Sequence, residues 1–408
     1  MRIQVPKKIV PLDSILPDEP LLMMGAGPVP IPARVAAANG IVINHLGDTM
    51  AQIIEQVKIM SGYVFQTNSG HILGVAGPGS AAMEMAIANL VVPGSKVVSV
   101  INGFFSSRLA EMSERMQANV ERLHIVDGQS ATVQQVEESI KQHRPQVLTI
   151  VQGETSNTTC NTDLAEIAAV AKRYDCLIVV DAVCTLSTMP LDMDEWGIDA
   201  VITGGQKGLS CIPGVSLVGF SERAWDLILA RKDQLRHWCL DAKLADQFWY
   251  KKSYHYTAPV SGILAIHEAL RLICNETLSV RFERHLRCSQ ALQAGIEAMG
   301  LKLYVEPASR LNSVVGITMP TSVDSKALLK HMSNRHRVEI SGSFGPNIVR
   351  IGQMGEQCRA HNLFRTLHAL GSSFNSLGQK LNLPGGVAAL ETTLDKYEFE
   401  PAEGLKLA

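Results

Sequence analysis

The sequence predicts an α/β protein with a large domain around a mostly parallel sheet and a small C-terminal α+β domain. Three observations support this prediction. The chain has 408 residues, enough for more than one domain. Short apolar, β-branched runs alternate with helical periods through its first half, which is typical of strands joined by crossover helices. The alternation loosens after residue 230, and a second unit is expected beyond that point.

Predicted strands and helices alternate between residues 96 and 220. The expected strands lie near 96–101, 119–125, 146–151, 177–181, 199–203 and 215–220, and the expected helices near 106–117, 132–142 and 163–174. Before these elements, one helix is expected to follow Asp48 or Thr49 and to end near residue 61, and another is expected over 81–88. Ligands of such sheets bind beyond the carboxyl ends of the strands. Residues that follow the strands are therefore the first candidates for a site.

The expected domain organisation has three parts. Residues 1–20 are expected to form an extended N-terminal arm, 21–290 the large domain and 291–408 the small domain. Long helices are expected near 261–274 and 278–298. The small domain is expected to contain strands near 301–305, 312–318, 337–341 and 348–352 and helices near 323–334 and 360–378.

Composition argues against several classes of partner. The 37 basic residues balance 39 acidic ones without a basic cluster, so nucleic acid is not an expected partner. The eight cysteines show no CxxC pair and no zinc-like spacing, so we expect reduced thiols, no metal and a cytoplasmic location. The N-terminus lacks the apolar core of a signal peptide, and no apolar run is long enough to span a bilayer. Membrane association is therefore not expected.

A lysine between glycines follows one of the predicted strands. Lys207 lies in Gly204-Gly205-Gln206-Lys207-Gly208, just after Val201-Ile202-Thr203, so we expect it in a turn that leaves a buried strand. Such a lysine is either a solvated loop residue or an amine held for covalent chemistry. Asp181 favours the second interpretation, because it ends the apolar run 177–180 as a carboxylate at a buried strand end. A lysine and a buried acid at neighbouring strand ends form the pair that a pyridoxal phosphate enzyme needs.

Two charges inside apolar runs each have a structural alternative. A buried carboxylate needs a partner, so Asp181 either caps a helix or pairs with an arginine, or it keeps a pyridine nitrogen protonated. Arg350 is the one charge in the run 348–352. Its planar guanidinium either forms an internal ion pair or accepts a substrate carboxylate bidentately.

Three further stretches suit a ligand, and each also has a structural interpretation. Gly79 and Ser80 begin a helix, where backbone N–H groups favour a phosphate, but Gly-Pro-Gly is also a common tight turn. Phe105 either packs in the core or stacks on a flat ring. The hydroxyl of Thr155 either stabilises a turn or bonds a ligand oxygen.

Taken together, these stretches resemble the class V aminotransferases of the fold type I pyridoxal phosphate superfamily, and most of all their alanine–glyoxylate / serine–pyruvate group. The resemblance covers about residues 20–370. It rests on Gly25-Ala26-Gly27-Pro28, Ala76-Gly77-Pro78-Gly79-Ser80, Asn102-Gly103-Phe104-Phe105, Gly153-Glu154-Thr155-Ser156, Val180-Asp181-Ala182-Val183, Gly205-Gln206-Lys207, Tyr254-His255-Tyr256-Thr257 and Arg350-Ile351-Gly352. The resemblance implies a large domain with a sheet of the seven-stranded type and pyridoxal 5'-phosphate as cofactor.

The resemblance also implies a role for each site residue. Lys207 is expected to form the Schiff base and Asp181 to bond the pyridinium nitrogen. The other expected cofactor contacts are Val183 and Phe105 on the two ring faces, Thr155 on the phenolic oxygen, and Gly79, Ser80 and Gln206 on the phosphate. Tyr254 and Thr257 are expected to reach that phosphate from a second subunit, which implies a homodimer with shared sites. Arg350 is expected to clamp the substrate carboxylate, and His45 and Gly27 to line the side-chain pocket.

Some positions depart from the family pattern. Phe105 stands where the family usually has a tryptophan, and Asn157-Thr158-Thr159-Cys160 stands where many members read Ser-Thr-Gly. The C-terminal extension from Leu377 is more similar to ureidoglycine–glyoxylate and pyridoxamine–pyruvate aminotransferases. The second substrate arginine of the latter is not evident around Gly342-Ser343-Phe344.

The predicted activity is a ping-pong transamination from a small donor (alanine, serine or a ureidoglycine-like amine) to glyoxylate or pyruvate. Alternatives are a pyridoxal phosphate-dependent lyase or sulfur-removing enzyme, a pyridoxamine–pyruvate aminotransferase, and a non-catalytic binding protein on the same fold.

Overall fold

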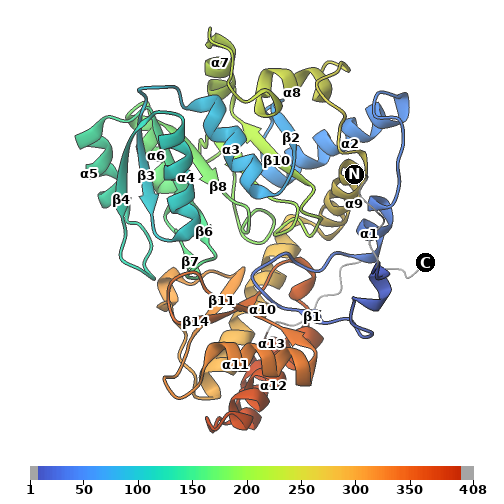
Figure 1. Ribbon diagram of the computed structural model, residues 1–408. Coiled ribbons are helices and arrows are strands. Elements are labelled where there is room, and N and C mark those ends of the chain that lie inside the picture. Colours follow the sequence, from blue (N-terminus) through green and yellow to red (C-terminus); the bar gives the residue numbers. More distant parts are fainter. Residues whose placement is uncertain (1–7, 397–408) are drawn as a thin grey trace, which may run out of the picture.

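The computed structural model describes residues 8–396 and shows two packed units (Figure 1). The larger unit is built on a seven-stranded sheet. In sheet order its strands are β2 (Ile72–Ala76), β10 (Val215–Phe220), β9 (Ala200–Ile202), β8 (Leu177–Asp181), β5 (Val147–Val151), β3 (Lys96–Ile101) and β4 (Asn119–His124). Strand β10 pairs antiparallel with both of its neighbours, whereas the five strands from β9 to β4 pair in parallel. The prediction of a mostly parallel sheet is confirmed.

Helices cover the sheet, as its burial pattern requires. Every residue of β5, β8 and β10 is buried, because a central strand with both faces covered has no solvent side. The edge strand β4 has no fully buried residue. The helices of this unit are α1 (Ala33–Asn39), α2 (Asp48–Phe65), α3 (Gly79–Leu90), α4 (Phe104–Arg115), α5 (Val133–His143), α6 (Leu164–Arg173), α7 (Glu222–Ala230), α8 (Ala242–Trp249) and α9 (Val260–Glu276). A short hairpin, β6 (Gly153–Glu154) with β7 (Thr159–Cys160), follows β5.

The smaller unit, in the lower part of Figure 1, has its own apolar core. Its antiparallel sheet has the order β11 (Val314–Thr318), β14 (Ile348–Gly352) and β13 (Ser341–Gly342). Its helices are α10 (Leu278–Ala298), α11 (Ser325–His336), α12 (Ala360–Ser376) and α13 (Leu383–Asp395). The predicted small α+β domain is thus present.

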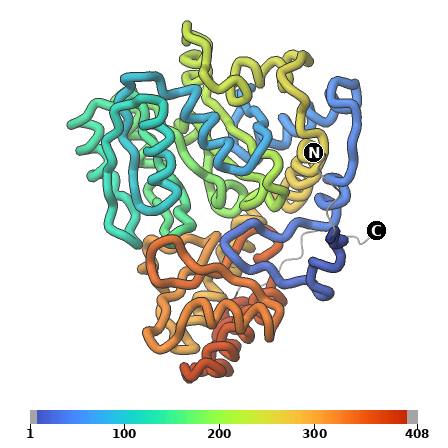
Figure 2. Tube along the Cα trace, in the orientation of Figure 1, coloured from blue at the N-terminus to red at the C-terminus, as the bar shows by residue number. Residues whose placement is uncertain are grey.

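Three details of this unit differ from the predicted pattern. Position 290 lies inside α10, whose residues from Cys288 onward join the apolar core of the smaller unit. The N-terminal strand β1 (Leu22–Met23) pairs with β12 (Val338–Glu339), and Figure 2 shows this blue segment beside the orange chain. Residues 301–305 form only one isolated bridge, at Leu303, although their alternating burial resembles that of a strand.

No helix within residues 8–396 has the length and apolar character needed to cross a membrane. Part of the predicted N-terminal arm, residues 1–7, lies outside the described residues. Residues 8–19 are exposed, with one short helical turn at Leu12–Ser14.

Candidate active site

The parallel sheet brings two of the predicted site residues to one edge. Asp181 is the last residue of β8 and pairs in register with Ile202, the last residue of β9. Lys207 lies in a turn, five residues beyond Ile202. Its backbone N–H donates a hydrogen bond to the carbonyl of Gly204, and its carbonyl accepts one from the N–H of Ser210. Strand ends of a parallel sheet meet at the same edge, so the predicted proximity of these residues follows from the topology.

Lys207 is enclosed by the N-terminal segment. Its Nζ donates a hydrogen bond to the carbonyl of Ala26. A Cβ atom at Gly27 would lie 2.5 Å from that Nζ, so only glycine fits here while Lys207 keeps this position. Burial lowers the pKa of Lys207 to about 8, and the charge of Arg350 acts in the same direction. Within residues 8–396 no carboxylate forms an ion pair with this amine.

Asp181 is a buried carboxylate that forms no ion pair with a cation of residues 8–396. It is 4% exposed, and its Oδ1 accepts a hydrogen bond from the Val183 N–H at 2.8 Å. Burial raises its pKa to about 7, and the nearby charge of Glu154 adds to the increase. Neither structural alternative is seen in the described part of the chain, since Asp181 caps no helix and pairs with no arginine.

Val183 lies against the start of α3. A Cβ atom at Gly79, the first residue of that helix, would lie 2.8 Å from Val183 Cγ2. The neighbouring Ser80 Oγ is 3.5 Å from Nη1 of Arg108. The side-chain oxygen of Gln206 is buried and has no hydrogen-bond partner among the described residues. The structure thus brings a helix N-terminus, a serine hydroxyl and the side chain of Gln206 to the edge of the sheet where Asp181 lies.

Phe105 is held through a carboxylate that sequence reasoning missed. Glu154, fully buried, accepts hydrogen bonds from the backbone N–H groups of Phe105 and Ser106 at 3.1 and 2.9 Å. Its charge therefore satisfies the N-terminus of α4, whose N-cap Gly103 has no side chain to do so. In the sequence, the only local indication of this contact is that the N-cap position holds a glycine, which cannot itself accept the N–H groups of the helix.

A second missed residue is Arg108. Its guanidinium lies 4.7 Å from the ring centroid of Phe104 and 5.2 Å from that of Phe105. No ion pair joins it to a carboxylate in the described range 8–396. Phe104 and Arg108 are four residues apart, so the sequence indicates that they share one face of the helix. The position of Ser80 beside Arg108 follows only from the tertiary structure.

Arg350 lies in β14 of the smaller unit and reaches the larger one. It is 4% exposed, and it donates from Nη1 to the carbonyl of Thr155 and from Nε to that of Gly342, both at 2.7 Å. Burial lowers the pKa of Arg350 to about 10. The internal ion pair that was its structural alternative does not form among residues 8–396. The predicted residue Thr155 therefore contacts Arg350 with its backbone carbonyl.

Three predicted residues lie together in a different place. The ring of His45 lies 5.9 Å from that of Tyr254, edge to face, and its Nδ1 accepts a 3.4 Å hydrogen bond from Ala258 N. Tyr254 is 55% exposed, and Thr257 is exposed as well. In the part of the chain that is described, no hydrogen bond or ring contact joins these residues to Lys207. They form a group of their own, separate from the contacts of Lys207.

The sequence profile described as aminotransferase class V matches residues 34–361, most of the chain. The chain belongs to the class V aminotransferases. This membership confirms the family predicted from the motifs, and it means that the protein is an enzyme that transfers an amino group.

Several named aminotransferases are similar to this chain over most of its length. The alanine–glyoxylate aminotransferase of Oryctolagus cuniculus is 35% identical over 367 residues, covering 88% of this chain and 93% of the relative. The crystal structure of ureidoglycine–glyoxylate aminotransferase from Bacillus subtilis superposes with a TM-score of 0.90 at 29% identity, covering 93% of this chain and 99% of that one. Pyridoxamine–pyruvate aminotransferase from Mesorhizobium loti gives a TM-score of 0.89 at 25% identity, with the same coverage of the two chains.

Proposed function

We propose that this class V aminotransferase uses pyridoxal 5'-phosphate to move an amino group from a small donor to glyoxylate or pyruvate in a ping-pong cycle. The donors we expect are alanine, serine or a ureidoglycine-like amine. The observation that supports this most directly is a set of three charged groups, the buried side chains of Asp181 and Arg350 and the partly buried amine of Lys207, none of which has an ion-pair partner within residues 8–396. Unpaired buried charges are costly, and a ligand that supplies the opposite charges relieves that cost.

The residues around these charges fit pyridoxal phosphate. Lys207 would bond the cofactor covalently, and the spare carboxylate oxygen of Asp181 would face the ring nitrogen. Val183 and Phe105 would lie on the two faces of the ring, and Thr155 on its phenolic oxygen. When bound, the cofactor supplies an electron sink for the substrate carbon that loses its proton.

The phosphate would lie at the N-terminus of α3. Gly79 and Ser80 offer backbone N–H groups and a hydroxyl there, and the side-chain NH2 group of Gln206 would donate a further hydrogen bond. These groups bear no positive charge. We propose that Arg108 supplies it, because its guanidinium lies 3.5 Å from Ser80 Oγ and has no acidic partner within the described residues.

Lys207 would also move the proton. Because the pKa of its amine is about 8, an appreciable fraction of Nζ is neutral near pH 7, and a neutral amine can accept the proton of the substrate Cα. Enclosure by Gly27 and Ala26 limits access of water to Nζ. The protonated amine of Lys207 would then hold this proton at Nζ, in position to give it back within the enclosed site.

Arg350 would bind the substrate carboxylate. Its two hydrogen bonds to carbonyls fix the direction of the guanidinium without neutralising it. The segment Gly342–Phe344 beside it contains no second cation, and the ring of Phe344 lies 5.6 Å from the guanidinium carbon. A second carboxylate therefore has no partner there, which argues against dicarboxylic donors such as glutamate.

The exposed group of His45, Tyr254 and Thr257 supports a homodimer. Tyr254 and Thr257 would donate hydrogen bonds to the phosphate of the second subunit's site, and His45, which contacts Tyr254, would face that subunit's substrate pocket. Apolar side chains are exposed nearby, with Ile41, Val42 and Leu46 between 48% and 79% exposed. Large exposed apolar side chains gathered in one loop are typical of a protein interface.

A sulfur-removing activity is less well supported. Such an enzyme needs an accessible thiolate, but Cys160, Cys184 and Cys211 are all buried. Burial raises the pKa of Cys160 and of Cys211 to about 12. Buried thiols also suit the reducing conditions of the cytoplasm, which we propose as the location.

A donor panel tests the proposal. Purified enzyme is incubated with alanine, serine, glycine, ureidoglycine, pyridoxamine, aspartate or glutamate, each with glyoxylate and with pyruvate, and the new amino and oxo acids are quantified. We expect transfer from the small neutral donors and little from aspartate or glutamate. Efficient transfer from glutamate to glyoxylate or pyruvate would contradict the pocket argument, and transfer only from pyridoxamine would favour the alternative activity.

A further inference from the structure

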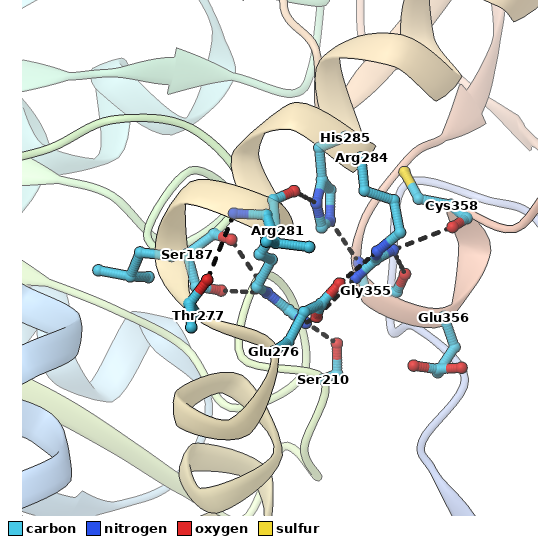
Figure 3. Close-up of polar contacts among 12 residues, drawn as sticks. Ser187, Ser210, Glu276, Thr277, Arg281, Arg284, His285, Gly355, Glu356 and Cys358 are labelled. Carbon is cyan, nitrogen blue, oxygen red and sulfur yellow. Dashed lines mark hydrogen bonds and ion pairs between the residues drawn. The ribbon is translucent and has the colours of Figure 1, made fainter. Parts of the chain in front are cut away.

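A buried cluster of charged side chains connects the turn of Lys207 to the smaller unit (Figure 3). We call it the Arg281 cluster. It consists of Glu276, Arg281, Arg284 and His285, at the junction of α9 and α10. Arg281 is 4% exposed and His285 fully buried. A buried ionic cluster is costly to form and is weak evidence for a stabilising role, so its geometry needs another explanation.

Arg281 contacts two segments, the one that contains Ser187 and the turn that follows Lys207. Its Nη2 donates to the carbonyl of Gly208 at 2.9 Å and to Ser210 Oγ at 3.3 Å. Its Nε donates to the carbonyl of Ser187 at 3.0 Å. Ser187 Oγ in turn donates to the same carbonyl of Gly208 at 2.8 Å. The residue directly after Lys207 is thus fixed by two donors.

The two serines held by Arg281 have an unfavourable backbone conformation. Ser187 has a φ of 70° and Ser210 a φ of 54°, the left-handed region that residues other than glycine rarely adopt. Such conformations persist only where surrounding contacts impose them. Ser210 N also donates to the carbonyl of Lys207 at 2.9 Å, so the conformation of Ser210 bears directly on where the lysine lies.

The other side of the cluster holds the smaller unit. Arg284 Nη1 donates to the carbonyls of Gly355 and Cys358, both at 2.9 Å. His285 donates from Nδ1 to the Arg281 carbonyl at 2.7 Å and accepts from the Gly355 N–H at 2.9 Å, which defines its neutral tautomer. Gly355 lies three residues after β14, the strand of Arg350.

One carboxylate joins two arginines at the centre of the cluster. Glu276 pairs with Nη1 of Arg281 at 2.8 Å and with Nη2 of Arg284 at 2.9 Å. Burial opposes the charge of Glu276, but the two arginines lower the pKa of its carboxyl to about 2. The carboxylate therefore stays ionised at any working pH and joins the two arginines.

Gly355 and Gln357 of the smaller unit also contact the segments around Lys207 directly. A Cβ atom at Gly355 would overlap Ser210 Oγ, so the smaller unit abuts the turn of Lys207 directly. Gln357 Nε2 donates to the carbonyl of Gly25 at 2.8 Å. Gly25 precedes Ala26, whose carbonyl accepts the hydrogen bond of Lys207 Nζ.

We propose that Arg281 is a positioning residue for Lys207, and that the Arg281 cluster fixes the lysine turn relative to the strand of Arg350. This inference rests on the proposed roles of Lys207 and Arg350. A lysine has one donor group and cannot replace the planar guanidinium, which reaches Ser187, Gly208 and Glu276 at once. The charge that balances Glu276 is nevertheless kept in Arg281→Lys.

The test compares Arg281→Lys with Arg271→Lys, a matched control in which the arginine pairs with Glu268 on α9, away from the turn. Hydrogen–deuterium exchange is measured first, on the folded proteins without substrate. We expect faster exchange of the peptide 207–211 in Arg281→Lys, no change in peptides of α3, and no change at all in the control.

Steady-state kinetics with the best donor–acceptor pair follow. We expect kcat of Arg281→Lys to fall by about 10- to 100-fold, because small displacements of a catalytic group are this costly. The KM values should change by less than about threefold, since Arg350 is still present to bind the carboxylate. A purely structural role would instead lower the yield of folded enzyme and leave kcat per folded site unchanged, and that result would overturn the proposal.

Ser210→Ala decides the question if Arg281→Lys does not fold. This variant removes only one acceptor of Arg281 and keeps every charge. Faster exchange of 207–211 with a lower kcat supports the proposal, and wild-type values of both contradict it. Failure of the proposed function is a separate outcome, because it would appear as absent transamination by the wild-type enzyme in the donor panel.

Discussion

Two groups of predicted site residues differ in how the fold presents them. Asp181 ends one parallel strand, Lys207 follows the neighbouring one, and both are enclosed by residues of the same chain. His45, Tyr254 and Thr257 lie on loops, and Tyr254 is 55% exposed. Both groups come from motifs of one family, so their different burial needs a physical reason.

The comparison teaches which part of the site one chain can complete. Sheet register places strand-end residues whatever their side chains are, and burial then changes the pKa of Asp181 and of Lys207. Loop side chains such as Tyr254 have no such framework. A second subunit, as proposed above, would supply it. The following experiments separate the two groups, in order of decreasing expected effect.

Lys207→Ala should have the largest effect. Removing the amine that bonds the cofactor and moves the proton should lower kcat by about 10⁴-fold or more. Borohydride reduction of the wild-type enzyme, followed by peptide mapping, should locate the cofactor on Lys207. Lys141→Ala, on an exposed helical face, is the control and should keep full activity. An adduct on any other lysine would refute the assignment.

Asp181→Asn should change stability with a defined pH dependence. The pKa of Asp181 is raised from 3.8 to about 7, so the folded protein binds an extra proton between these values and the stability contributed by this group falls as pH rises through that window. Without cofactor, the advantage of the variant over the wild type should therefore grow by about 2–3 kcal/mol between pH 5 and pH 8. Urea unfolding of both proteins at the two pH values measures this.

With cofactor present, the same substitution should nearly abolish turnover while the protein stays folded. An asparagine has no charge with which to keep the ring nitrogen protonated. Normal activity per folded molecule would restore the structural interpretation of Asp181.

Arg350→Lys should act on binding. Replacing a bidentate, charge-assisted contact by a single one costs about 1.5–3 kcal/mol, so the KM values of donor and acceptor should rise together by about 10- to 150-fold. Arg365→Lys, on the exposed face of α12, is the matched control in the same unit. An increase for only one of the two substrates would mean that Arg350 binds something other than the group they share.

Tyr254→Phe and Thr257→Ala should have the smallest effects. Each removes one hydrogen bond, so the dissociation constant of the cofactor should rise by about 3- to 10-fold. Thr162→Ala, at another exposed threonine, should leave it unchanged.

Mixed dimers then test the sharing of sites. Subunits with Lys207→Ala are combined with subunits that carry both Tyr254→Phe and Thr257→Ala, at limiting cofactor. If the sites are shared, each mixed dimer contains one fully intact site, and activity should recover. Lack of recovery in dimers shown to be mixed, or a fully active monomer in sedimentation, would refute the shared site.

Much of the fold and half of the site were predictable from local patterns. The β-branched runs around β5 and β8 and the helical periods between them predict a parallel sheet, because apolar strands buried on both faces have few alternatives. That topology alone brings Asp181 and Lys207 to one edge. The prediction of a strand at 301–305 was wrong. Alternating apolar residues indicate which side chains are buried, whereas a strand also needs a partner strand along its length.

The sequence by itself determined the alternating architecture, the family motifs and the residue types available for chemistry. Only the tertiary structure decided that Glu154 satisfies the start of α4, that Arg108 lies beside Ser80, and that the Arg281 cluster joins two units. The contacts that join different segments link residues 28 to 94 positions apart. No local pattern encodes them, because they exist only once packing has brought the charges together and excluded water from between them.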